Sequence, residues 1–129
     1  MKKPVLLITF LYLFTLTGCS ERVGTGNNNA ANTEVKWTEV TRFEGNSIKD
    51  TGTFEITSSE WRISWDTKPG DYGAMNFQIY IYKPDKSLVD VAANVIGESK
   101  DSSVQRGSGE YYLTINSAQP YTVIIEEKK

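Results

Sequence analysis

The stretch Phe77-Gln78-Ile79-Tyr80-Ile81-Tyr82 alternates strictly between apolar residues and residues that carry a polar group. Successive side chains of a β-strand point to opposite faces of the sheet, so this order buries the phenylalanine and both isoleucines on one face. The same period of two recurs from about residue 35 onward, in the sets Trp61/Ile63/Trp65, Leu113/Ile115 and Tyr121/Val123/Ile125. The pattern therefore predicts a protein built from half-buried strands.

Turn residues separate these runs at short intervals. Gly45-Asn46, Lys83-Pro84-Asp85 and Gly107-Ser108-Gly109 are of the types that favour tight turns. Seven to eight short strands, with a turn about every 8–12 residues, predict an all-β fold: an antiparallel β-sandwich of jelly-roll type. Residues 88–96 alternate like a strand, but two adjacent alanines leave a short helix open. The candidate core residues are large and apolar: Phe54, Trp61, Trp65, Phe77, Leu113 and Tyr121.

The N-terminus has the composition of a secretion signal. Lys2 and Lys3 precede an apolar run over residues 5–16, which matches the ~7–15 apolar residues usual in a signal peptide. A membrane-spanning helix needs roughly 20 apolar residues. This run gives way to small, polar and charged residues before that length. We therefore expect a cleaved signal rather than a retained transmembrane helix.

The signal ends in Leu16-Thr17-Gly18-Cys19, which holds the only cysteine of the chain. This run resembles the lipobox of bacterial lipoproteins. The resemblance implies that the Cys19 sulfur receives a diacylglycerol, that the lipoprotein signal peptidase cuts after Gly18, and that the new amino group is often acylated. A thiolate is the nucleophile that such a modification needs, and two or more acyl chains anchor a protein stably. The alternative is an unmodified cysteine at the end of an ordinary signal peptide.

The sequence thus divides into a signal peptide (1–18), a lipidated cysteine with a flexible tether (19–34) and a β-sandwich domain (35–129). Gly, Asn, Thr and Ala dominate residues 20–34, which cannot bury enough apolar surface to offset ordering. Loss of two lysines with the signal changes the formal net charge from −2 to −4. This acidic balance argues against nucleic acid as a partner. We expect the lipid anchor to hold the protein on the extracytoplasmic face of the cell membrane or envelope.

The later strands also resemble the pre-peptidase C-terminal type of β-sandwich found in secreted bacterial proteins. The matching runs are Phe77–Tyr82, Gly109–Ile115 and Tyr121–Ile125, about half of the mature domain. That family often has an acidic residue just before the middle strand of its domain. The corresponding residue of this chain is Asn76, directly before Phe77–Tyr82. The resemblance implies a sandwich fold and leaves a calcium role unsupported.

Candidate sites are few. The chain has no histidine, which excludes Ser-His-Asp and Cys-His catalysis and histidine-rich zinc sites. Asp66 and Asp71 flank a short loop and could offer oxygens to calcium, or they could simply end a strand and form a turn, which we prefer; we therefore predict no metal site. Tyr80, Tyr82 and Tyr112 fall on the polar phase of their strands. They predict either an exposed aromatic platform for sugars or partner proteins, or ordinary cross-strand pairing.

These features together predict a lipid-anchored bacterial protein that carries a small, non-catalytic binding or structural module. We expect no cofactor apart from the covalent lipid, and an envelope protein or a glycan as the partner. Two alternatives stay open: an envelope hydrolase or accessory factor that uses carboxylates, and a calcium-stabilised adhesion module. The first needs two acidic side chains that converge in one cleft, and the sequence offers no clear pair.

Overall fold

The computed structural model describes residues 34–129. Within it, Val35–Lys129 form one compact unit. The expected signal peptide, the lipobox (Leu16, Thr17, Gly18 and Cys19) and nearly all of the expected tether lie outside the described residues.

The described chain is built of antiparallel strands, as the period-two pattern predicts. The strands are β1 (Trp37–Gly45), β2 (Lys49–Asp50), β3 (Phe54–Ile56), β4 (Glu60–Thr67), β5 (Asn76–Tyr82), β6 (Leu88–Ile96), β7 (Ser99–Arg106), β8 (Gly109–Ser117) and β9 (Tyr121–Lys128). Residues 88–96 form strand β6, so the helix that we left open there is wrong. Two of the strands, β2 and β3, are very short and pair with the same neighbour, β8.

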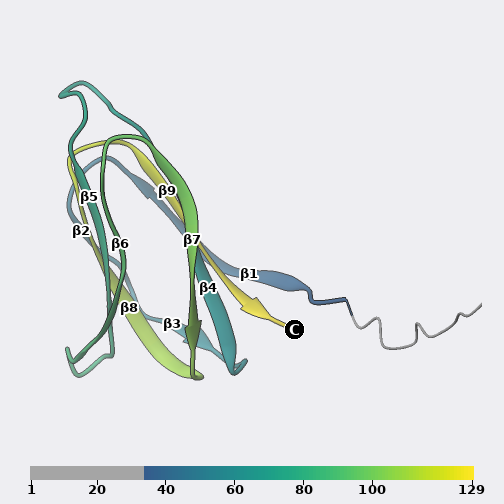
Figure 1. Cartoon of the computed structure of the whole chain (residues 1–129). Coiled ribbons are helices and arrows are strands. Elements are labelled where there is room, and N and C mark those ends of the chain that lie inside the picture. The colour runs from purple at the N-terminus through teal and green to yellow at the C-terminus, as the bar shows by residue number, and fades with distance from the viewer. Residues whose placement is uncertain (1–33) are drawn as a thin grey trace, which may run out of the picture. The chain divides into compact units, whose positions relative to one another are not determined.

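The strands form two sheets, which Figure 1 shows as two layers. One sheet has the order β1-β9-β4-β7, and the other has the order β2-β8-β5-β6 with β3 also on β8. When β2 and β3 are taken as one interrupted strand, every connection crosses between the sheets except the β5–β6 hairpin. This is the strand order of a jelly roll, and it confirms the predicted antiparallel β-sandwich.

The core lies between the two sheets and uses the inward-facing residues of both. All six residues predicted for it are buried there, together with Ile56, Ile63, Ile79, Ile81, Ala93, Tyr111, Ile115, Val123 and Ile125. Trp61 packs on Tyr111 with ring centroids 4.8 Å apart, and Phe54 meets the edge of the same indole at 5.8 Å. Each large ring removes much apolar surface from water. This aromatic cluster lets a small domain without a disulfide close around an apolar interior.

Side-chain hydrogen bonds hold the loops at one end of the sandwich. Gln119 is fully buried. Its amide nitrogen donates to Gly97 O at 2.7 Å and to Thr67 Oγ1 at 2.9 Å, and its Oε1 accepts from Met75 N at 2.9 Å. One side chain thereby ties the β4–β5, β6–β7 and β8–β9 connections together. Figure 1 shows these connections at the end opposite to the C-terminus.

Candidate functional site

The outer faces of the two sheets differ sharply in charge. The β1-β9-β4-β7 sheet carries a network of ion pairs: Glu39–Arg42, Arg62–Glu126, Asp66–Lys100, Glu60–Arg106 and Glu60–Lys128. Most of the charged side chains on this surface are therefore paired with a charge of opposite sign. The Arg62 guanidinium also lies 4.4 Å from the centroid of the Trp37 ring. We call this surface the charged face. The other sheet presents uncharged polar and aromatic side chains on β5 and β8, with the exposed carboxylates of Asp50, Glu55 and Glu110 toward its β2 and β3 edge.

On that other sheet, two of the three predicted tyrosines come together. Tyr82 of β5 and Tyr112 of β8 are direct cross-strand partners. Their rings stack with centroids 5.3 Å apart and an interplanar angle of 18°. Tyr80 lies on the same face two residues earlier, where its cross-strand partners are Thr114 and Val91 instead of another aromatic residue. The geometry thus gives a stacked pair with a third tyrosine beside it.

A row of three amides crosses the same face next to the tyrosines. Gln78 lies between Asn94 of β6 and Asn116 of β8 in the strand register. The Asn116 amide donates to Gln78 Oε1 at 2.7 Å, and the Gln78 amide donates to Asn94 Oδ1 at 3.1 Å. We call the surface formed by Gln78, Tyr80, Tyr82, Asn94, Tyr112 and Asn116 the tyrosine–amide face. The amide row was missed from the sequence, because it appears only once the register of three strands is known.

Aliphatic side chains of the edge strand border this face. Leu88 pairs with Tyr82 and Val91 with Tyr80, and they are 55% and 41% exposed. Strand β6 is irregular at two points, between the partners of Ile79 and Tyr80 and between those of Ile81 and Tyr82. Bulges of this kind re-aim side chains and spoil an edge for pairing with another strand. They place these two side chains beside the tyrosines.

The two aspartates considered for calcium do not form a site. Asp66 lies on the charged face, where its Oδ2 is 3.8 Å from the Lys100 ammonium. Asp71 is an exposed residue of the β4–β5 loop. Among residues 34–129, no group of three or more histidine, cysteine or acidic side chains is placed to hold a metal ion.

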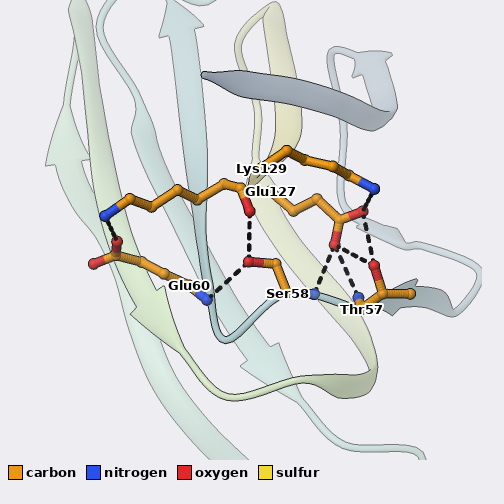
Figure 2. Close-up of polar contacts among 6 residues, drawn as sticks. Thr57, Ser58, Glu60, Glu127 and Lys129 are labelled. Carbon is orange, nitrogen blue, oxygen red and sulfur yellow. Dashed lines mark hydrogen bonds and ion pairs between the residues drawn. The ribbon is translucent and has the colours of Figure 1, made fainter. Parts of the chain in front are cut away.

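The most buried acidic side chain is Glu127, near the end of β9, and it closes the β3–β4 turn (Figure 2). Its Oε1 accepts from Thr57 N at 2.8 Å, Ser58 N at 3.0 Å and Thr57 Oγ1 at 3.1 Å, and its Oε2 lies 3.2 Å from the Lys129 ammonium. Burial is the largest single influence on the pKa of Glu127 and raises it. The backbone donors, the lysine and the hydroxyl together outweigh burial and hold the pKa below its usual value.

A second carboxylate, Glu60, lies close by in the fold but on the other side of the sheet. It accepts a 2.6 Å hydrogen bond from Lys128 and a 2.8 Å bond from Arg106 on the charged face. The hydrogen bond from Lys128 is the main reason that the pKa of Glu60 is lowered. Glu127 is paired with buried Trp61 in the register and faces inward. The two acids therefore do not share a cleft, and both act as structural ties that sequence reasoning missed.

Comparison of the chain with protein-family models and with curated proteins found no match. Within the described residues, no helix has the length and apolarity that crossing a membrane requires.

Proposed function

We propose that this protein is a lipid-anchored bacterial lipoprotein whose jelly-roll domain binds an extracellular glycan on the tyrosine–amide face. The observation that carries the binding proposal is the stacked Tyr82–Tyr112 pair beside the hydrogen-bonded amide row. Sugars offer apolar C–H faces together with many hydroxyl groups. Aromatic rings and uncharged amides, which both donate and accept hydrogen bonds, complement those two features.

The character of the two outer faces supports a glycan over a protein strand. The charged face already satisfies most of its own groups through ion pairs. The tyrosine–amide face is bordered by an edge strand with two bulges, which hinder the addition of a partner's strand. A ligand that lies across the sheet, rather than along its edge, suits this surface better.

The proposed location at the membrane rests on the sequence alone. Leu16-Thr17-Gly18-Cys19 follows a basic start and an apolar run of signal-peptide length. Lipid on Cys19 would hold the domain at the outer side of the membrane without help from the acidic domain surface.

The binding proposal is tested by co-sedimentation of the full chain, in detergent, with insoluble polysaccharides: peptidoglycan, chitin and cellulose. We expect at least one of them to retain the protein, and the double variant Tyr82→Ser/Tyr112→Ser to lose at least tenfold in affinity. Tyr72→Ser is the matched control, because Tyr72 is 79% exposed in the β4–β5 loop away from the stacked pair. Equal losses in control and double variant, or retention by none of the polysaccharides, would overturn the glycan proposal in favour of a protein partner.

The anchor is tested by metabolic labelling with radioactive palmitate. The wild-type chain should incorporate label, and Cys19→Ala should not, because it removes the only thiol that could carry the diacylglycerol. Label that persists in Cys19→Ala would contradict the lipoprotein assignment.

A further inference from the structure

One end of the tyrosine–amide face opens into an apolar hollow. Its volume is about 450 Å³, within the ~300–1,000 Å³ usual for small-molecule sites. Ile48, Met75, Ile96 and Ala118 are apolar residues of its lining, and Asn76 and Asn116 are residues of the lining that carry amides. Asn116 is also a member of the amide row, so the hollow continues that face.

Hydrogen bonds hold the backbone segments that carry the walls. Met75 N donates to Gln119 Oε1, and Met75 O accepts from Gly97 N at 3.1 Å, directly after Ile96. Ser47, which precedes Ile48, accepts a 3.1 Å hydrogen bond from the Tyr121 hydroxyl. A hollow held in this way is formed before any ligand arrives, which lowers the entropic cost of binding.

The hollow leaves apolar surface in water. Ile96 is 71% exposed and Ile48 is 68% exposed. Single exposed apolar residues are ordinary on protein surfaces. Here two of them, with Met75, surround one depression that is bordered by amides. Such a grouping is typical of a binding site.

The lining selects a ligand by charge as well as by shape. None of the side chains around the hollow is ionisable: they are aliphatic, thioether, hydroxyl and amide groups. The ligand group that fits is therefore uncharged and combines a small apolar part with a hydrogen-bonding part. An acetamido group has a methyl for the walls and an N–H and a C=O for the asparagine amides.

We infer that the glycan of the proposed function is an N-acetylated hexosamine chain, with one acetamido group in the hollow formed by Ile48, Met75 and Ile96. This inference rests on the glycan proposal above. Tyr112 and Asn116 are four positions apart in β8, a distance of ~13 Å along a strand. A short linear oligosaccharide therefore spans both the stacked tyrosines and the hollow.

The test is calorimetric titration of the full chain, in detergent, with two matched tetrasaccharides. One is the β-1,4-linked tetramer of N-acetylglucosamine, and the other is the β-1,4-linked tetramer of glucose, which differs only in carrying a hydroxyl group in place of each acetamido group. We expect the N-acetylated tetramer to bind at least tenfold more tightly. The variant Ile96→Lys should reduce that preference to less than threefold, while Val104→Lys, at an exposed valine of β7, should leave it unchanged.

The outcomes separate the two proposals. Equal binding of the tetramers to the wild-type chain, or a preference that survives Ile96→Lys, overturns the acetamido assignment and leaves the glycan proposal standing. Binding of neither tetramer overturns the acetamido assignment as well, and the co-sedimentation experiment then decides whether the glycan proposal stands. Thermal unfolding of each variant checks that the lysine substitutions leave the fold intact.

Discussion

Glu127 joins the last strand to the β3–β4 turn through one carboxylate. Two backbone N–H groups, a threonine hydroxyl and a lysine converge on its oxygens. Hydrogen bonds to a charged group contribute about 1.5–3 kcal/mol, because the full charge on one partner strengthens the electrostatic attraction. This tie connects residues 70 positions apart in the sequence. It therefore contributes to closing the sandwich as well as to shaping a turn.

Replacing this residue by glutamine gives a pH-dependent prediction. The pKa of Glu127 is lowered by folding, so the folded state binds its proton less readily than the unfolded chain, which titrates near 4.5. The stability that the carboxylate contributes is therefore present above that pH and is lost as the pH falls through the lower folded pKa. We expect Glu127→Gln to reduce the free energy of unfolding by about 1–2 kcal/mol at pH 7, and by much less at pH 3.

Urea unfolding of both proteins at pH 7, 5, 4 and 3 measures this difference. Glu44→Gln is the control, because Glu44 is exposed on β1. A loss in Glu127→Gln that is the same at pH 3 and pH 7 would show that its charge plays no part in the tie.

Gln119 is a residue that composition alone would place in a surface turn. It lies between an alanine and a proline in a short β8–β9 connection, yet its side chain is fully buried. Its three hydrogen bonds satisfy groups in loops that are distant in sequence. Buried polar groups without partners are costly, and this explains why a polar residue occupies the position. No local sequence pattern predicts these hydrogen bonds, because they depend on how three loops pack together.

The strand that pairs with β8 on the side away from β5 is interrupted at Thr51. It therefore consists of two short pieces, β2 and β3. Thr51 N donates to Leu113 O at 2.9 Å, and Thr51 Oγ1 accepts from Leu113 N, also at 2.9 Å. The hydroxyl thus takes the place of a backbone carbonyl in the ladder. This is why β2 and β3 are separate although both pair with β8. A side-chain hydroxyl that replaces a backbone carbonyl in the ladder leaves no trace in a pattern of apolar residues.

Thr51→Val tests this account of the break. Valine has nearly the same shape but cannot accept the Leu113 N–H, which is buried. We expect a loss of about 1–2 kcal/mol in the free energy of unfolding. Thr53→Val, at an exposed position in the same segment, should change it by less than about 0.5 kcal/mol. Chemical denaturation of the two variants compares them, and equal effects would mean that the Thr51 hydroxyl is not needed in the ladder.

Strand β7 shows where the period-two argument stops. Its sequence, Ser99–Arg106, contains one valine among polar residues, so no alternation marks it. It is an edge strand of the β1-β9-β4-β7 sheet and pairs only with β4 in that sheet. An edge strand with lysine and aspartate on it resists pairing with other chains. Strand β7 forms because it pairs with the backbone groups of β4 on the side that faces away from β9.

At the scale of the whole molecule, the sequence predicted the fold class and the core because both follow from burial on one face per strand. Jelly-roll connectivity follows from the strand order, which joins residues as distant as Trp37 and Lys128. The tyrosines were predicted as a group, but only Tyr82 and Tyr112 stack. The amide row and the hollow needed the register of three strands and the positions of three loops. Composition alone could not supply either.

The two ends of the sandwich have different characters. The described chain enters at Trp37, whose partner Lys128 lies in the last strand, so both termini of the domain are at one end. Glu127 lies at that end as well, because it pairs with Thr38, next to the Trp37–Lys128 pair. The apolar hollow lies among the loops at the other end. The hollow and the two termini of the domain therefore lie at opposite ends of the sandwich.

The central claim is that the tyrosine–amide face binds the ligand, and nuclear magnetic resonance tests it most directly. The full chain, labelled with ¹⁵N in detergent, is titrated with the N-acetylglucosamine tetramer. We predict that the side-chain amides of Gln78, Asn94 and Asn116 and the backbone amides of Tyr82 and Tyr112 shift together in a saturable way. Ser64 and Ser102 on the charged face should not shift. Saturable shifts confined to the charged face, or none at all, would contradict the account.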